Sequence, residues 1–246
     1  MKKFALVAVI VLAALALSAC GGGAQKVQVA TDATWPPFEM VDEATKQIVG
    51  FDIDLMNGIA KAGGFEVEYI NVSWDPLLAG VAQCQYDAAI SAMTITEERA
   101  QSMGFSDPYF AAGQVVTVRF DETGIASKDD LSGKTVGAQI GTTGAFEVEK
   151  ISGATLKTYD TVDLAFQDLM NGQIDAVIAD NPLAIGYVGQ NPDKLKTVGE
   201  VFTDEHYGVA VCKTNTELLA KVNKGLAEVK ASGLVEELTA KWLAAK

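Results

Sequence analysis

Apolar and polar positions alternate in short blocks along this 246-residue chain, and the blocks predict strands and helices in turn. Runs rich in valine and isoleucine are typical of buried strands, whereas apolar residues three or four apart after Gly50 predict a helix capped by Asp52. Such alternation indicates an α/β architecture. The predicted strands are 27–30, 67–72, 88–90, 134–138 and 174–178, and the predicted helices follow Gly50 and cover 77–82, 145–151, 162–170 and 218–243, with a break at Gly233.

The two halves of the chain repeat this order of elements. The segments 86–90 (YDAAI) and 174–178 (IDAVI) each follow a predicted helix and a polar turn, and each leads to the carboxyl edge of a strand. Open α/β sheets bind ligands at that edge. Two such units joined by extended segments would enclose a cleft, which is a preferred place for a small ligand.

The N-terminus has the pattern of an export signal. Two lysines precede an apolar run of 14 residues, which is too short to span a bilayer comfortably. The run leads into LSAC at 17–20, which resembles a bacterial lipobox. We expect a lipoprotein signal peptide over 1–19 and a lipidated Cys20 with a flexible tether over 20–26. The alternative is an ordinary signal peptide with a coincidental cysteine.

Charge and composition exclude several classes of partner. The chain has 19 basic and 32 acidic residues, a net charge of −13, and removal of the two signal lysines leaves 17 against 32, or −15. Nucleic acid and polybasic docking to lipid both need a basic surface. A single histidine, His206, and no C-x-x-C argue against a metal site. Cys84 and Cys212 form either a disulfide or two free thiols.

The mature chain contains two arginines, and one of them is a candidate for binding a carboxylate. Arg99 ends the segment SAMTITEER at 91–99. Its guanidinium offers the planar fork of donors that matches a carboxylate. The alternative is an ion pair at a helix end with Glu97 or Glu98. Arg119, which lies in an apolar run, is interpreted as structural.

Polar residues at predicted strand ends suggest further contacts. Thr94 and Thr142 lie near helix starts, where hydroxyls and free backbone N–H groups bind anions, although simple N-capping is the alternative. Asp180 follows a strand and suits an ammonium group, or else forms an Asx turn before Asn181-Pro182.

Two tryptophans lie in predicted loops beside prolines rather than in apolar periodic runs. Trp35 and Trp74 therefore suggest ligand contact, since indole faces grip planar groups and cations. Asp32 adds an acceptor beside Trp35. No nucleophile motif, phosphate loop or organised acid–base pair is present in the sequence.

Five motifs occur in a specific order, and together they carry a family resemblance. They resemble the polar amino-acid solute-binding proteins of ABC importers, solute-binding protein family 3, over about residues 27–243. The motifs are GFDIDL at 50–55, YDAAISAMTITEER at 86–99, FSDPYF at 105–110, LSGK at 131–134 with GTTG at 141–144, and DAVIAD at 175–180.

The resemblance implies the type II periplasmic-binding-protein clamshell, an α/β fold of two lobes that each hold a mixed sheet flanked by helices. Lobe 1 would comprise 27–113 and 207–246, and lobe 2 would comprise 114–206. The chain would cross between the lobes near 112–116 and near 205–208.

The resemblance also assigns roles around a bound amino acid. Arg99, Thr94 and the Thr142–Thr143 turn would hold its carboxylate, while Asp180, the Ala92 carbonyl and the Thr94 hydroxyl would hold its ammonium group. The tryptophans would form side-chain walls, with polar contacts from both lobes. The implied ligand-binding set is Asp32, Trp35, Trp74, Ala92, Met93, Thr94, Arg99, Gln139, Thr142, Thr143 and Asp180.

The function implied is capture of a free L-amino acid by lobe closure and delivery to an ABC transporter permease, by an exported, monomeric protein without cofactor. The two tryptophans and Asp32 favour arginine, then glutamine or lysine. The alternative is a cyclohexadienyl- or arogenate-dehydratase-like enzyme on the same fold, with Glu39 or Asp32 as its acid. A receptor sensor domain is a third interpretation.

Overall fold

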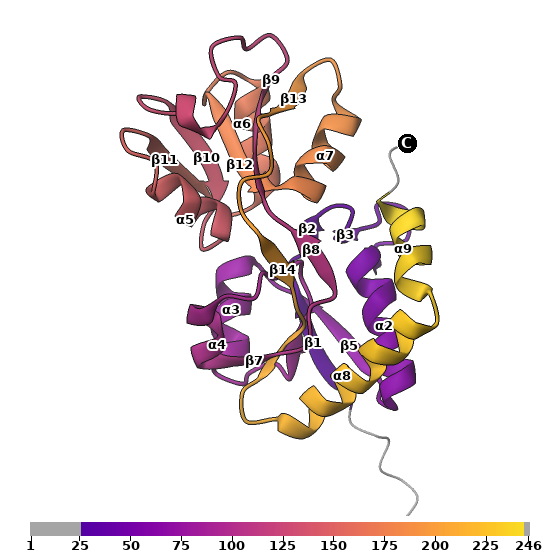
Figure 1. The fold of residues 1–246 in the computed structure, drawn as a ribbon. Coiled ribbons are helices and arrows are strands. Elements are labelled where there is room, and N and C mark those ends of the chain that lie inside the picture. Colours follow the sequence, from indigo (N-terminus) through magenta and orange to yellow (C-terminus); the bar gives the residue numbers. More distant parts are fainter. Residues whose placement is uncertain (1–25, 244–246) are drawn as a thin grey trace, which may run out of the picture.

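The computed structural model describes residues 26–243, whose main strands form two five-stranded sheets in two lobes (Figure 1). The predicted signal peptide and Cys20 lie outside these residues. Lobe 1 has the strand order β5-β1-β6-β15-β7, and lobe 2 has β11-β10-β12-β9-β13. The strands of lobe 1 are β1 (Val27–Thr31), β5 (Val67–Asn71), β6 (Ala88–Ala89), β7 (Met103–Phe105) and β15 (Ala210–Cys212), and those of lobe 2 are β9 (Gln114–Arg119), β10 (Thr135–Gln139), β11 (Thr155–Tyr159), β12 (Ala176–Asp180) and β13 (Leu195–Val198).

The two sheets have the same plan, as the repeated pentapeptides predict. β6 and β12 are each the third strand of their sheet. β6 pairs parallel with β1 and antiparallel with β15, and β12 pairs parallel with β10 and antiparallel with β9. All five residues of β12 are buried, which explains its continuous apolar pattern.

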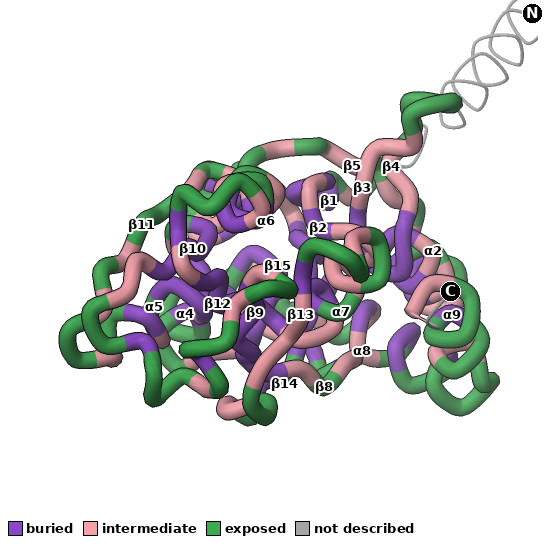
Figure 2. The backbone as a smooth tube through the Cα atoms, turned by 90° about the horizontal axis from the view of Figure 1, so that it is seen from above, coloured by how far each residue is buried: buried purple, intermediate pink, exposed green. Residues whose placement is uncertain are grey.

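Helices cover both faces of each sheet, because alternate strand residues point to opposite sides. In lobe 2, Ala176 and Ile178 pack with Val148 of α5, whereas Val177 and Ala179 pack with residues of α6 and α7. Figure 2 shows buried residues concentrated along the strands. The helices are α2 (Phe51–Gly63), α3 (Trp74–Ala82), α4 (Glu97–Ser102), α8 (Thr216–Ala231) and α9 (Leu234–Trp242) in lobe 1, and α5 (Thr143–Glu149), α6 (Val162–Met170) and α7 (Asn181–Gln190) in lobe 2.

The predicted break at Gly233 is confirmed, since α8 and α9 meet there at φ +80°. The predicted cap of α2 is wrong. Gly50 is the N-cap residue, and Asp52 lies inside the first turn with its side chain bonded elsewhere. The predicted loops at Trp35 and Trp74 are also wrong, because Trp35 lies in a short strand over 34–35 and α3 begins at Trp74. The alternative of an Asx turn after Asp180 is wrong as well, because α7 begins at Asn181 and the Asp180 side chain makes no capping bond.

Two short strands join the lobes. β8 (Phe110–Ala112) and β14 (Glu205–Tyr207) pair antiparallel between the sheets, and Figure 1 shows the chain passing from lobe to lobe beside them. A small sheet of β2 (Thr34–Trp35), β3 (Glu39–Val41) and β4 (Ile48–Val49) borders lobe 1. Within residues 26–243, no helix is both long and apolar enough to cross a membrane.

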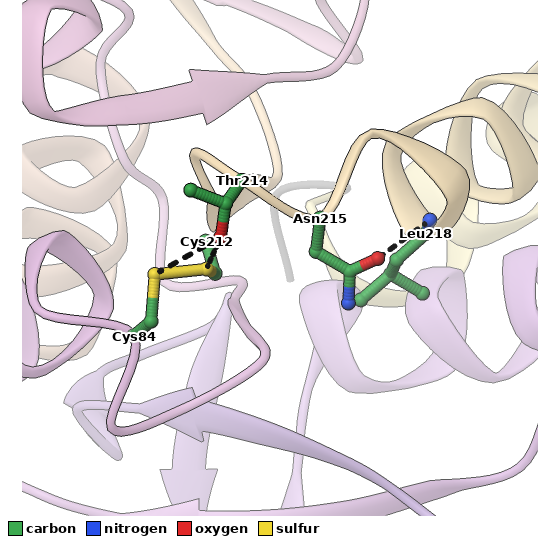
Figure 3. The surroundings of a disulfide bond; sticks show 5 residues. All are labelled: Cys84, Cys212, Thr214, Asn215 and Leu218. Atoms are coloured by element: carbon green, nitrogen blue, oxygen red, sulfur yellow. Dashed lines mark hydrogen bonds between the residues drawn. A yellow bond between two sulfur atoms is a disulfide. The ribbon is translucent and has the colours of Figure 1, made fainter.

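Cys84 and Cys212 form a disulfide, which decides between the two alternatives that the sequence left open. The bond joins residues 128 positions apart, and Figure 3 shows it beside the Thr214 hydroxyl. The Cys212 N–H donates to the Asp87 carbonyl, which precedes β6. The disulfide and this hydrogen bond therefore tie the C-terminal part of lobe 1 to the amino end of β6, its central strand.

Candidate functional site

The carboxyl ends of the parallel strands bring polar residues of both lobes together. Asp32 follows β1, Ala92 follows β6, Gln139 ends β10 and Asp180 ends β12. A cavity of about 10 Å³ lies between these ends, a volume that suits about one water molecule. A larger ligand therefore requires the lobes or side chains to move apart. The cavity is lined by Trp35, Trp74, Ser91, Ala92, Thr94, Arg99, Thr142, Thr143 and Asp180.

Most of the residues predicted for the site line this cavity, and three do not. Met93 is fully buried in a hydrophobic cluster with Leu77, and its carbonyl accepts a hydrogen bond from the Gly208 N–H at 3.0 Å. Asp32 and Gln139 contact each other beside the cavity.

Arg99 is held in the first turn of α4 with its guanidinium among carbonyl groups. Nη1 donates to the Thr94 carbonyl at 2.8 Å, and Nη2 donates across the lobes to the Gly141 carbonyl at 3.1 Å. The guanidinium carbon lies 5.2 Å from the Trp74 ring centre. Burial lowers the pKa of Arg99 to about 10, so the group stays charged at neutral pH.

Arg99 forms none of the ion pairs found within residues 26–243, so the alternative of a pair with Glu97 or Glu98 is wrong. A buried guanidinium whose neighbours are carbonyl groups and an aromatic ring can bind the carboxylate of a ligand by donating hydrogen bonds to it. The indole N–H of Trp74 is also buried, and it has no hydrogen-bond partner among the described residues.

The two candidate threonines differ in role. The Thr142 hydroxyl caps α5, where it accepts from the Ala145 N–H at 3.3 Å, so the capping alternative is correct for this side chain. Thr94 caps no helix, because Thr96 is the N-cap residue of α4. The Thr94 hydroxyl instead donates to Glu205 Oε2 at 2.8 Å.

Asp180 is a fully enclosed carboxyl group at the end of β12. Tyr207 donates to its Oδ2 and Gln114 to its Oδ1, each at 2.5 Å. Burial and then the negative charge of Glu205 raise the pKa of Asp180 to about 7, although Arg99 acts in the opposite direction. A positive group at the cavity would therefore be stabilised by Asp180 in its ionised form.

Glu205, at the start of β14, connects the lobes through threonine hydroxyls. Its Oε2 accepts from Thr94 of lobe 1 and from Thr143 of lobe 2, both at 2.8 Å, while Oε1 accepts from Thr203. The same oxygen thus joins the starts of α4 and α5. These bonds leave the lone pairs of the Thr94 hydroxyl free to accept from another donor.

Asp32 also takes part in a contact between lobes. Gln139 of lobe 2 donates to Asp32 Oδ2 at 2.9 Å and accepts from the Trp35 indole N–H at 2.5 Å. Thr34 donates to the other oxygen of Asp32. Burial raises the pKa of Asp32, as expected for a carboxyl group with no basic neighbour.

The structure adds four residues that sequence reasoning missed. They are Ser91, Gln114, Glu205 and Tyr207. Three of them, Gln114, Glu205 and Tyr207, fall in the predicted crossings at 112–116 and 205–208, so a polar side chain at a crossing was the available signal. Ser91 contacts Glu39, which lies 52 positions away, and no local pattern marks it.

Known proteins resemble this chain over nearly the whole of its described length. The model of the family described as bacterial extracellular solute-binding proteins, family 3, matches residues 27–245. A probable histidine-binding protein of Neisseria gonorrhoeae is 38% identical, with 99% of this chain and 96% of that protein covered. An ancestral arginine-binding protein solved with arginine has a TM-score of 0.85 and 44% identity, with 89% of this chain and 98% of that chain covered.

A third relative is the arginine-, lysine-, histidine-binding protein ArtJ of Geobacillus stearothermophilus. Its structure has a TM-score of 0.84 and 43% identity, with 89% of this chain and 95% of that chain covered. All three relatives are described as binding proteins rather than enzymes. The fold is the type II periplasmic-binding-protein clamshell, and the chain belongs to family 3 of the bacterial extracellular solute-binding proteins.

Proposed function

We propose that this protein binds a free L-amino acid between its lobes, with arginine as the preferred ligand ahead of glutamine and lysine, and delivers it to the permease of an ABC transporter. The observation that carries the proposal is a buried, charged Arg99 that has no carboxylate partner among the described residues and lies on the same cavity as Asp180. A positive group and a negative group on the same cavity complement the two charges of a zwitterionic amino acid.

The carboxylate of the amino acid would replace the carbonyl partners of Arg99. The fork of the guanidinium then makes two parallel bonds, which is its strongest arrangement. The backbone of the Thr142–Thr143 turn adds N–H donors. Gly141 opens this turn at φ +69°, in the region that favours glycine, and a Cβ there would lie 2.7 Å from Asp75 Oδ1.

The ammonium group would bind Asp180, the Ala92 carbonyl and the Thr94 hydroxyl. Thr94 can accept from an ammonium group because its own proton points to Glu205. Binding of the ammonium group would lower the pKa of Asp180 and so release its proton below about pH 7.

The side chain of the ligand would extend between Trp35 and Trp74 towards Asp32. A guanidinium can replace the Gln139 amide on Asp32 and bring its own charge to a buried carboxyl group. The names of the three relatives refer to arginine, lysine and histidine, and this supports a basic ligand. An acidic amino acid would face Asp32 with like charge.

Closure follows from contacts that the ligand makes to both lobes at once. Arg99 and the tryptophans belong to lobe 1, whereas Asp180 and the Thr142–Thr143 turn belong to lobe 2. The closed form would present surfaces of both lobes to the permease. Lipid on Cys20 would hold the monomer at the membrane, with no other membrane segment, no nucleic acid and no cofactor required.

Replacement of Asp32 by asparagine tests the choice of ligand. We expect the affinity for arginine to fall by about tenfold or more, because a hydrogen-bonded charge pair becomes a neutral contact. The affinity for glutamine should change less than about threefold, since its amide needs no counter-charge. Isothermal calorimetry with both ligands measures the difference.

Asp193→Asn is the matched control, because it removes one negative charge from an exposed position. It should leave both affinities unchanged. Equal losses for arginine and glutamine in Asp32→Asn would show that Asp32 is not the counter-charge of the ligand.

A further inference from the structure

Two carboxyl groups that the proposed site does not use lie directly beneath it. Glu39 of β3 and Asp52 of α2 are both 0% exposed. Within residues 26–243, no lysine or arginine donates to either of them, although each is hydrogen-bonded. Such a pair is costly to bury, so its contacts need an explanation.

Asp52 holds the backbone of Ala92. Its Oδ2 accepts from the Ala92 N–H at 2.7 Å and from the Tyr109 hydroxyl at 2.7 Å. Ala92 has φ +43°, in the left-handed region that residues other than glycine rarely adopt. The strong bond to a carboxylate thus stabilises an unfavourable backbone conformation, and that conformation sets where the Ala92 carbonyl points.

Glu39 holds Ser91, the residue before Ala92, by a hydrogen bond. Its Oε1 accepts from the Ser91 hydroxyl at 3.0 Å, and the oxygen of Ser91 accepts from the Asp32 N–H at 3.0 Å. The two acids therefore support both Ala92 and the backbone of Asp32.

A single proton can supply the hydrogen bond that the two remaining carboxyl oxygens of the pair lack. The oxygens without an assigned partner are Glu39 Oε2 and Asp52 Oδ1, both buried. A proton on Glu39 Oε2, donated to Asp52 Oδ1, would give each oxygen a partner, and the two side chains are close enough for that bond. Burial and then the charge of Asp52 raise the pKa of Glu39 well above its usual range, with a smaller contribution from Asp32. Burial also raises the pKa of Asp52, but Asp52 Oδ2 accepts two hydrogen bonds whereas Glu39 accepts one, so the proton belongs on Glu39.

We propose that Glu39 and Asp52 share one proton and act as a positioning pair, which holds Ser91 and Ala92 so that the Ala92 carbonyl and Asp32 face the ligand. This inference rests on the proposed function, because those two groups matter only if an amino acid binds there. Asp52 acts as the anionic acceptor, and Glu39 acts as the neutral donor.

The two acids should respond differently to conversion into amides. In Glu39→Gln, the amide nitrogen can donate to Asp52 and its oxygen can accept from Ser91, so the affinity for L-arginine should stay within about threefold. In Asp52→Asn, the Ala92 N–H loses its charged acceptor, and the new amide faces the proton of Glu39. We expect about a tenfold weaker affinity by calorimetry at 25 °C.

Tyr109→Phe is the matched control, since it removes the other donor to Asp52 Oδ2 and leaves the Ala92 bond intact. Its affinity should stay within about threefold. Thermal unfolding of each variant separates positioning from folding, because Asp52→Asn is expected to bind weakly while fully folded. Wild-type affinity in Asp52→Asn, or an equal loss in Glu39→Gln, would overturn the proposal.

Infrared spectroscopy tests the shared proton even if Asp52→Asn does not fold. At pH 8.5 we expect Asp52 and Asp180 to be ionised, and the spectrum should still contain the carbonyl band of one protonated carboxyl group, which Glu39→Gln removes. Absence of the band from the wild-type spectrum contradicts the proposal. If the wild-type protein binds no amino acid, the proposed function fails; if it binds L-arginine and Asp52→Asn binds it equally, only the positioning role fails.

Discussion

Replacement of Arg99 by alanine is expected to remove nearly all affinity for amino acids while the fold persists. Loss of one partner from a buried, hydrogen-bonded charge pair costs about 2–5 kcal/mol, which corresponds to a roughly 30- to several-thousand-fold weaker affinity. Arg99→Lys should fall between wild type and alanine, because lysine keeps the charge and loses the planar fork. Calorimetry with L-arginine measures both variants.

The chain offers a close control in its other arginine. Arg119 donates to the Ile174 carbonyl and lies 3.6 Å from Asp121, away from the cavity. Arg119→Ala should bind L-arginine with wild-type affinity. Circular dichroism should show wild-type secondary structure in both alanine variants. A folded Arg99→Ala protein with near-normal affinity would refute the carboxylate role of Arg99.

Removal of the disulfide is expected to have the largest effect on stability. The bond closes a segment of 128 positions, and loss of a native bridge typically costs about 2–5 kcal/mol. For a protein of this size, that loss should lower Tm by roughly 5–15 °C. Thermal unfolding of the Cys84→Ser/Cys212→Ser double variant, compared with the wild type, measures the change.

The same variant should keep its affinity for L-arginine within about twofold at 25 °C. Cys212 is bonded at the amino end of β6, whereas the cavity lies at the carboxyl end of that strand. An unchanged Tm would show that the bridge does not limit the stability of lobe 1. A large loss of affinity in the folded variant would show instead that the bridge supports the site.

Much of the fold followed from local patterns, and two of the errors share a physical cause. The sequence correctly predicted α6, the break at Gly233 and the correspondence of β6 with β12. The loop predicted at Trp74 and the alternative of a turn after Asp180 both rested on a nearby proline. Proline is tolerated in the first turn of a helix, where its missing N–H has no intrahelical partner, and both prolines lie there.

Part of the site could be predicted because strand ends and turns carry it. Arg99 and Asp180 end two of the motifs, Thr94 lies in the turn before Arg99, and all three line the cavity. Asp52 shows why the rest could not be predicted. Its place near a helix start suggested a cap, but its partner, the Ala92 N–H, lies 40 positions away. Such contacts depend on how distant segments pack, and no periodicity or spacing records them.

The central claim is that this protein binds a basic L-amino acid between its lobes, and a thermal-shift screen of the twenty amino acids tests it most directly. A ligand that binds only the native state adds about 2.7 kcal/mol of stability at a concentration of 100 Kd. We predict the largest rise in Tm with L-arginine, smaller rises with lysine and glutamine, and none with aspartate or glutamate. No rise with any amino acid, or the largest rise with an acidic one, would contradict the account.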